Sequence, residues 1–118
     1  MVTDFDLLCE QGTDLSFTVT YRRGETDIPV DLTGGFARMQ ARASMNASAP
    51  FLDVDSGSKG GIAVGGANGQ ITIFVPANVT DAFLPTREAV YDLEFVDNSG
   101  RTSRVLKGRF RVARQVTR

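Results

Sequence analysis

Histidine and tryptophan are both absent from this sequence, and cysteine occurs only once, as Cys9. Without histidine the chain has no imidazole to act as a general base, to activate a serine or cysteine nucleophile, or to complete most zinc sites. A single cysteine cannot form an internal disulfide. These absences argue against an enzyme and against a disulfide-stapled domain, and the sequence predicts no cofactor.

Long apolar runs are missing as well. No stretch approaches the ~18 apolar residues that a membrane helix needs. The N-terminal segment, residues 1–6, is acidic and has neither the basic nor the apolar region of a signal peptide. We therefore expect a protein that is made in the cytoplasm, has no membrane partner and keeps Cys9 reduced and buried.

Apolar and polar side chains alternate with the two-residue period of β-strands along most of the chain. Two C-terminal runs flank the turn at residues 97–100 and predict an antiparallel hairpin. In the first run Asp92 and Glu94 face outward. The apolar positions on the opposite, inward faces of the two runs are Ala89, Tyr91, Leu93, Phe95, Leu106, Phe110 and Val112.

Further strands are predicted at residues 5–9, 15–21, 36–42, 51–54, 61–64 and 70–75. Short strands separated by regular turn signals indicate an all-β sandwich or barrel. The 118 residues, 42% of them hydrophobic, are enough for one core, so we predict a single domain over residues 1–118.

One segment has room for a helix. Residues 79–84 lie between Pro76 and Pro85, and one or two helical turns there fit a crossover between two sheets. Tyr91 lies near the start of the next strand. It is either a corner tyrosine, whose hydroxyl bonds back to the preceding corner as in immunoglobulin-like folds, or an ordinary core residue.

The glycine-rich middle of the chain lacks the spacing of a phosphate-binding loop, so we interpret it as turns, with Asn68-Gly69 as a two-residue hairpin turn. Residues 53–57 resemble the opening of a calcium loop. Val64 stands where that loop needs a bidentate glutamate, so a solvated turn is the better interpretation and no metal site is predicted.

Charge is divided unevenly along the chain. The net charge is −1, yet the last 18 residues carry seven basic residues and no acidic ones. The predicted partner-binding residues are Arg101, Lys107, Arg109, Arg111, Arg114 and Arg118. These residues either dock on an acidic neighbouring subunit or protect an edge strand from aggregation. Copies of the same chain would supply acid through Asp4, Asp6, Glu10 and Asp14.

Two further expectations follow from this basic segment. Nucleic acid is disfavoured as a partner, because interleaved exposed aromatics are missing and the rest of the chain is acidic. Residues 114–118 are predicted to form a C-terminal arm that orders against a partner.

Several segments resemble small structural proteins of tailed bacteriophages, and in particular the N-terminal domain of the upper baseplate proteins that attach receptor-binding proteins to the tail. The segments that carry the resemblance are residues 8–14, 29–34, 37–42, 61–64, 69–73, 91–96 and 106–109. In larger relatives a fibre or receptor-binding region follows such a domain. Because this chain stops at Arg118, we expect a stand-alone adaptor.

The resemblance implies an Ig-like antiparallel β-sandwich of about seven or eight short strands. It also implies a non-enzymatic structural protein of the virion at the tail, baseplate or fibre-attachment region. Its partners would be copies of itself and other virion proteins in a symmetric multi-copy assembly. Capsid decoration or a place in the neck or collar is the alternative. A carbohydrate-binding β-sandwich is disfavoured because the sequence offers no platform of exposed aromatics.

Overall fold

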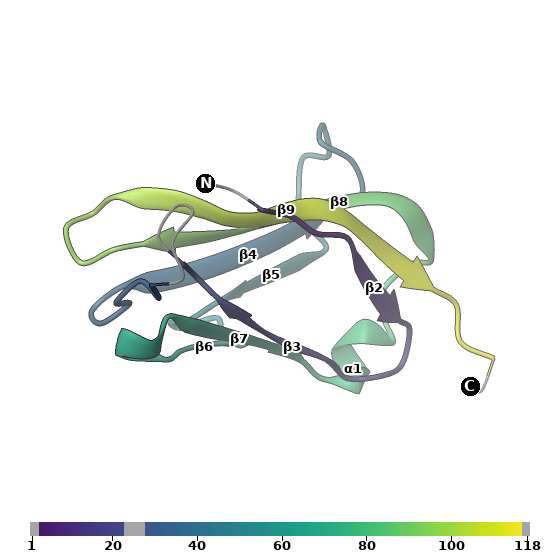
Figure 1. The fold of residues 1–118 in the computed structure, drawn as a ribbon. Coiled ribbons are helices and arrows are strands. Elements are labelled where there is room, and N and C mark those ends of the chain that lie inside the picture. The colour runs from purple at the N-terminus through teal and green to yellow at the C-terminus, as the bar shows by residue number, and fades with distance from the viewer. Residues whose placement is uncertain (1–2, 23–27, 117–118) are drawn as a thin grey trace.

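Two β-sheets pack face to face in the computed structural model, which describes residues 3–22 and 28–116 (Figure 1). The larger sheet has the order β1-β9-β8-β4-β5, with β2 also paired to β9, and the smaller has the order β3-β7-β6. The strands of the larger sheet are β1 (Thr3–Asp4), β2 (Leu7–Glu10), β4 (Phe36–Arg42), β5 (Leu52–Asp55), β8 (Thr86–Val96) and β9 (Thr102–Ala113). Those of the smaller sheet are β3 (Leu15–Thr20), β6 (Ile62–Val64) and β7 (Gln70–Val75). The predicted all-β sandwich is confirmed.

The core lies between the sheets and follows the alternation seen in the sequence. Inward residues of β7 such as Ile71 and Ile73 are fully buried, as are Ala37 and Met39 of β4. Phe110 of β9 is also fully buried, and three other rings meet it edge to face. The ring centroids of Phe51, Phe83 and Tyr91 lie 5.6, 6.2 and 6.2 Å from that of Phe110.

The predicted C-terminal hairpin is confirmed, and one carboxylate organises its turn. Asp97 Oδ1 accepts hydrogen bonds from the Ser99 hydroxyl at 2.7 Å, the Ser99 N–H at 2.9 Å and the Arg101 N–H at 2.9 Å. These bonds, with the Ser99 hydroxyl contributing most, lower the pKa of Asp97 because they favour its charged form. Gly100 supplies the positive φ of 90° that the turn requires.

The N-terminal segment forms two short strands parallel to β9 rather than one strand at residues 5–9. β1 pairs with Leu106 and Lys107, and β2 pairs with β9 from Phe110 onward. Between them the chain passes over Gly108, where a Cβ atom would lie 2.3 Å from the Phe5 carbonyl oxygen. From Leu106 to Ala113, β9 is therefore flanked on both sides, so the edge-protection interpretation is wrong for Lys107, Arg109 and Arg111.

The crossover from the smaller to the larger sheet contains the single-turn helix α1 (Ala77–Thr80). It begins and ends earlier than the predicted 79–84, because side chains distant in sequence fix both ends. Asp14 Oδ1 accepts the Ala77 N–H at 2.8 Å, and the fully buried Thr80 donates from Oγ1 to the Thr13 carbonyl at 2.7 Å. In the described part of the chain, no helix is long and apolar enough to span a membrane.

The β6–β7 hairpin exists as predicted, but its loop is longer than two residues. A 3₁₀ turn, η1 (Gly66–Asn68), is followed by Gly69 with φ of 71°. The Gly65 N–H donates to the Gln70 carbonyl at 2.7 Å and closes a four-residue loop, residues 66–69, in place of a two-residue turn. Asn68 Oδ1 accepts the Gln70 N–H at 3.0 Å, so asparagine acts through its side chain here.

Candidate functional site

The basic residues of β9 form a row on the outer face of the larger sheet. Lys107, Arg109 and Arg111 are exposed and alternate with buried residues of the same strand. Arg101 lies apart from this row, in the turn before β9, and Arg114 follows the end of the strand. Arg118 lies outside the described residues. The structure thus brings together three of the six predicted residues.

Arg87 and Arg104 also lie on this outer face, although the alternating pattern would place both side chains inward. The pairing of β8 with β9 shifts register between Thr86 and Ala89 and again between Leu93 and Glu94. The first shift lets Arg87 lie exposed, and the second gives β9 an extra residue, so that Arg104 faces outward. Bulges insert single residues, so a period-two pattern carries no signal for them.

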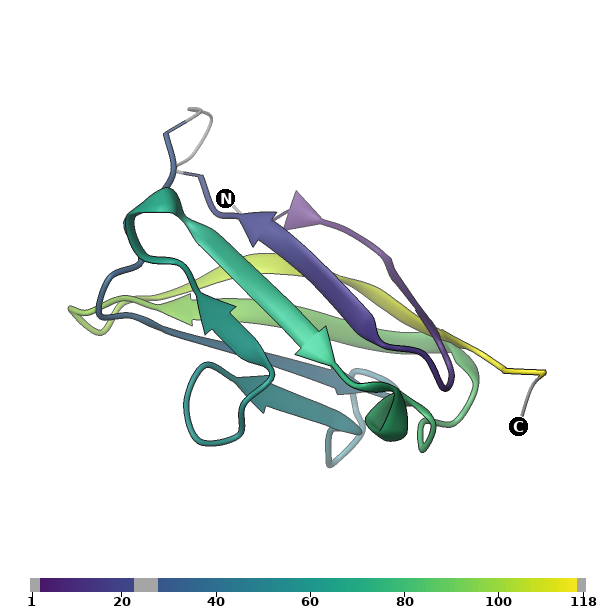
Figure 2. The ribbon, with the colours of Figure 1, turned by 90° about the horizontal axis from the view of Figure 1, so that it is seen from below.

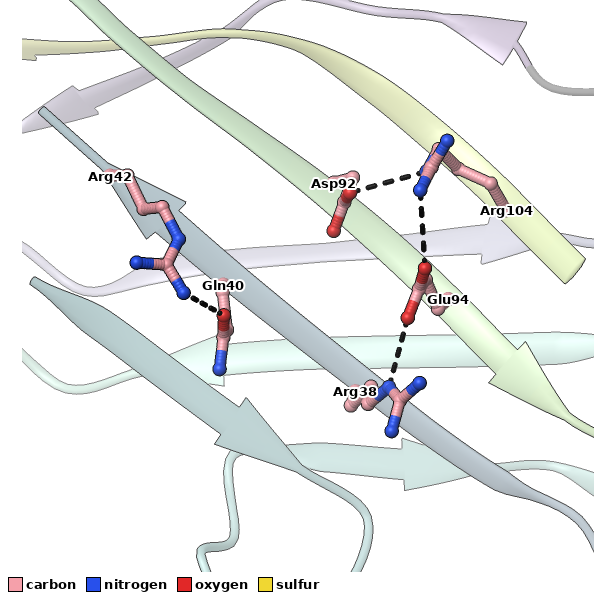
Figure 3. A network of polar contacts seen from close by, with 6 residues as sticks. All are labelled: Arg38, Gln40, Arg42, Asp92, Glu94 and Arg104. Carbon is pink, nitrogen blue, oxygen red and sulfur yellow. Dashed lines mark hydrogen bonds and ion pairs between the residues drawn. The ribbon is translucent and has the colours of Figure 1, made fainter. Parts of the chain in front are cut away.

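One end of this outer face is neutralised within the chain (Figure 3). Arg104 Nε lies 3.2 Å from Asp92 Oδ2, and its Nη2 lies 3.3 Å from Glu94 Oε2. The other oxygen of Glu94 lies 2.9 Å from Arg38 Nε on β4. Glu94 is thus held between two guanidinium groups and Asp92 is paired with one of them, an arrangement that stabilises the sheet surface rather than a pair poised for acid–base chemistry.

The other end of the face carries three arginines whose side chains form no ion pair or hydrogen bond within residues 3–22 and 28–116. We call Arg87, Arg109 and Arg111 the arginine face. They line a shallow groove of ≈ 360 Å³ together with Asp6, Leu7 and Leu8. Leu8 is opposite Arg111 in the strand register and is 53% exposed. Positive charge and an apolar side chain are therefore presented side by side.

The predicted acidic residues are distributed along the N-terminal segment, and three of the four make contacts within the chain. Asp4 Oδ1 lies 3.9 Å from Lys107 Nζ, and Asp6 Oδ1 accepts the Arg109 N–H at 3.0 Å. Asp14 binds the start of α1, while Glu10 is exposed at the end of β2. Their use by a second copy stays a prediction.

Tyr91 is not a corner tyrosine. Its hydroxyl donates to the carbonyl oxygen of Phe5, between β1 and β2, instead of to the corner that precedes β8. Burial raises the pKa of the Tyr91 hydroxyl, so it stays a donor through the neutral range. Tyr91 sits in the middle of β8 and reaches across β9 where Gly108 has no side chain, which ties the N-terminal segment to the sheet.

The predicted C-terminal arm begins on the surface of the domain. The Gln115 N–H donates to Gln11 Oε1 at 3.2 Å, and the Gln115 side chain donates to Asp81. Arg114 is exposed and lines a shallow hollow with Leu84, which is 82% exposed. Residues 117–118 of the arm lie outside the described residues.

The calcium-like segment is a self-satisfied turn. Asp55 Oδ1 accepts the N–H groups of Gly57 at 2.8 Å and Lys59 at 3.1 Å, and Lys59 Nζ lies 2.7 Å from Asp53 Oδ2. Within the residues that the structure describes, no group of histidine, cysteine, aspartate or glutamate side chains has the arrangement of a metal site. Cys9 is 1% exposed, and burial raises the pKa of its thiol to about 11, so it stays protonated.

Comparisons with known proteins place the fold. No protein-family model matches the chain, and no curated protein sequence is similar to it. Solved structures are similar in fold, among them a chicken T-cell receptor with a TM-score of 0.57 and 12% identity. That match covers 98% of this chain, which spans only 56% of the receptor chain.

Extracellular domains of voltage-gated sodium channel β subunits are also similar. The match to the β4 subunit has a TM-score of 0.51 and 10% identity, and it covers 96% of this chain and 93% of the β4 chain. The match to a second β-subunit structure has a TM-score of 0.52 and 9% identity, and it covers 93% of this chain and 92% of that chain. At such identities the likeness speaks to the fold alone, and that fold is an Ig-like β-sandwich.

Proposed function

We propose that this chain is a non-enzymatic structural subunit of a tailed-phage virion, an adaptor or attachment subunit at the tail, baseplate or fibre region. The observation that carries the proposal is the arginine face, whose three guanidinium groups are left unpaired beside the exposed Leu8. Guanidinium groups bind carboxylates through paired hydrogen bonds and are enriched at protein interfaces. The resemblance of the sequence to tailed-phage structural proteins supports the virion as the setting.

The polar clusters of the described chain support a binding role over a catalytic one. Asp92 and Glu94 are engaged by arginines, and Asp53 by Lys59. None of these carboxylates stands beside a nucleophile or a base in an enclosed pocket, the arrangement on which most hydrolytic sites depend.

The extracellular domain of the sodium channel β4 subunit forms parallel homodimers that explain its role in cell–cell adhesion, and sodium channel β subunits make multimeric cell-adhesive interactions. In those proteins the sandwich serves protein–protein contact. We assign the same general use to this chain, with copies of itself and neighbouring virion proteins as partners.

The alternative location within the virion is the capsid surface or the neck. A carbohydrate-binding role is disfavoured by the placement of the exposed aromatics. Among the described residues, Phe5 follows β1, Phe36 begins β4 and Phe74 lies on β7 of the other sheet. Rings on separate elements make no flat platform for a sugar.

Purified particles of the phage or prophage that encodes the chain provide the test of the virion proposal. Mass spectrometry should find the protein in gradient-purified particles, and immunogold labelling should mark the tail end. Label over the head or neck would favour the alternative location. Absence of the protein from such particles by mass spectrometry would refute the virion proposal.

Charge reversal on the arginine face tests the contact itself. Arg109→Glu with Arg111→Glu should leave the domain folded, because both side chains are exposed and unpaired, yet reduce incorporation into particles at least about 10-fold. Arg101→Glu is the matched control for Arg111→Glu. It makes the same change of charge, but Arg101 lies in the turn at the far end of β9, away from the arginine face. Equal incorporation of R111E and R101E would contradict docking through the arginine face.

A further inference from the structure

One edge of the smaller sheet has no partner strand in the described part of the chain. β3 pairs with β7 on one side only (Figure 2). The N-terminal strands β1 and β2 could have flanked it, but both pair with β9 in the larger sheet. The sandwich is thus left open along β3.

The direction of the unpaired backbone groups follows from the register. The Tyr21 N–H donates to the Gly69 carbonyl at 2.7 Å, which fixes residue 21 as facing β7. In an antiparallel pair alternate residues face the partner, so Phe17 and Val19 also bond to β7. The N–H and C=O groups of the intervening residues point to the open edge. These residues are Ser16, Thr18 and Thr20.

A side-chain contact agrees with this assignment. Thr18 Oγ1 lies 3.0 Å from Thr72 Oγ1, directly across the strand pair. Such close approach is typical of the narrow, non-hydrogen-bonded pairs of an antiparallel ladder.

The inward side chains along this edge are incompletely covered. Ile71 and Ile73 of β7 are fully buried, whereas Phe17 and Val19, paired to them in β3, are only partly buried. The core therefore ends at β3 with apolar surface still in contact with solvent. A strand added at this edge would bury that surface and satisfy the backbone groups together.

The remaining edges carry protection that β3 lacks. The β1–β2 edge bears Asp4 and Asp6 and is interrupted between its two strands. On the opposite side, the Asp55 N–H donates to the Gly60 carbonyl at 2.9 Å and joins β5 to the segment before β6. By contrast, the six residues of β3 (Leu-Ser-Phe-Thr-Val-Thr) include no charge, proline or glycine, which are the usual devices against edge pairing.

We propose that β3 pairs with β3 of a second copy of this chain, antiparallel and about a two-fold axis, so that two three-stranded sheets become one continuous sheet. A two-fold axis perpendicular to the sheet keeps Phe17 and Val19 of both copies on the core side. The contact uses the same residues on both molecules, so it closes as a dimer and does not propagate. An uncharged strand meets its own copy without repulsion.

This inference does not depend on the virion setting or on the arginine face. β3 lies in the smaller sheet, whereas Arg87, Arg109 and Arg111 lie on the larger one. A dimer through β3 leaves both arginine faces available to other partners, which gives one assembly unit two kinds of contact.

Analytical ultracentrifugation of the whole chain over a range of concentrations tests the dimer. The wild type should show a monomer–dimer equilibrium. Thr18→Lys and Thr18→Glu each place like charges opposite each other at the middle of the edge. Each should raise the dissociation constant at least about 10-fold. An equal mixture of T18K and T18E should recover a heterodimer, which also shows that both variants fold.

Thr18→Val is the matched control. It removes the same hydroxyl contact with Thr72 but adds no charge, so its dissociation constant should equal that of the wild type. Hydrogen exchange supplies the second readout, in which the Ser16, Thr18 and Thr20 amides become protected as concentration rises. A wild type that stays monomeric, or T18K dimers as stable as those of T18V, would overturn the proposal.

Discussion

The two ends of the outer face of the larger sheet hold similar numbers of charged groups but use them differently. At one end, Arg38 and Arg104 enclose Glu94 in a network satisfied within the chain. At the other, the guanidinium groups of Arg109 and Arg111 form no ion pair among the described residues, and Asp6 binds only the backbone N–H of Arg109. Charge that is neutralised internally contributes to the stability of the fold. Charge that is left unpaired costs the fold little and remains available to a partner.

Gly108 separates the two ends, and its substitution should have the largest effect. Gly108→Ala places a Cβ 2.3 Å from the Phe5 carbonyl oxygen, so β1 and β2 must move away from β9. We expect a loss of about 2–3 kcal/mol in the free energy of unfolding, measured by urea denaturation. The shift also carries Leu8 away from Arg111, and so disrupts the arginine face while the Arg38–Glu94–Arg104 network stays in place.

Gly57→Ala is the control for this variant, because the atom nearest to its added Cβ belongs to the movable ring of Phe36, at 3.0 Å. Its free energy of unfolding should stay within about 0.5 kcal/mol of the wild type. Similar stabilities for G108A and G57A would show that the close approach at Gly108 does not hold the N-terminal segment.

Tyr91 fixes the N-terminal segment from the other side of β9, and its removal should have an intermediate effect. Tyr91→Phe leaves the Phe5 carbonyl without its hydroxyl donor and should cost about 1–2 kcal/mol in the free energy of unfolding. Urea denaturation of both proteins at neutral pH measures this difference. An unchanged midpoint would mean that water replaces the hydroxyl without loss.

The burial of the Tyr91 hydroxyl and the Cys9 thiol predicts that the free energy of unfolding depends on pH. Burial raises the folded-state pKa values of Tyr91 and Cys9 above their unfolded values, so the unfolded chain loses these protons first as the pH rises. The stability that these two groups contribute should therefore be constant below about pH 8 and fall above it. The slope above about pH 10 should be shallower in Tyr91→Phe. Equal slopes in the two proteins would contradict the assignment to Tyr91.

Substitutions of single charged residues at the two ends should have the smallest effects on stability, and they compare the two ends directly. Glu94→Gln removes the charge that binds Arg38 and Arg104 and should cost about 0.5–1 kcal/mol, less at high salt because the pairs are partly exposed. Arg111→Gln should leave the free energy of unfolding unchanged within about 0.5 kcal/mol. Thermal denaturation at low and high salt measures both, and a stability loss in R111Q as large as that in E94Q would remove the distinction between the ends.

Local pattern predicted the parts of the fold whose causes lie within a few residues. The alternation around Leu93 and Phe110 placed both residues inward, and the turn chemistry of Asp97 and Gly100 placed the hairpin between their strands. The two-residue turn at Asn68-Gly69 and the helix at residues 79–84 were wrong in extent. In both cases a residue outside the predicted segment sets the boundary: the Gly65 N–H donates to the Gln70 carbonyl, and Asp14 accepts the Ala77 N–H.

The candidate site was predicted only in part, for a similar reason. Lys107, Arg109 and Arg111 follow the strand period, so their shared face could be predicted. Arg87 and Arg104 reach that face through shifts in the register between β8 and β9, and register is a property of two strands rather than one. The edge-protection interpretation failed because pairing with β1 and β2 is a contact between the two ends of the chain.

The sequence by itself determined that this protein is an all-β sandwich or barrel without histidine chemistry or an internal disulfide, because composition and period-two alternation are readable in a single chain. Tertiary structure alone decided which charges are neutralised and which edge is open. Asp92 and Glu94 are equally acidic residues in the sequence, as Arg104 and Arg111 are equally basic. The register shift within the β8–β9 hairpin sets Arg104 beside two carboxylates. The pairing of strands distant in sequence leaves Arg111 beside Leu8 and leaves β3 with one neighbour.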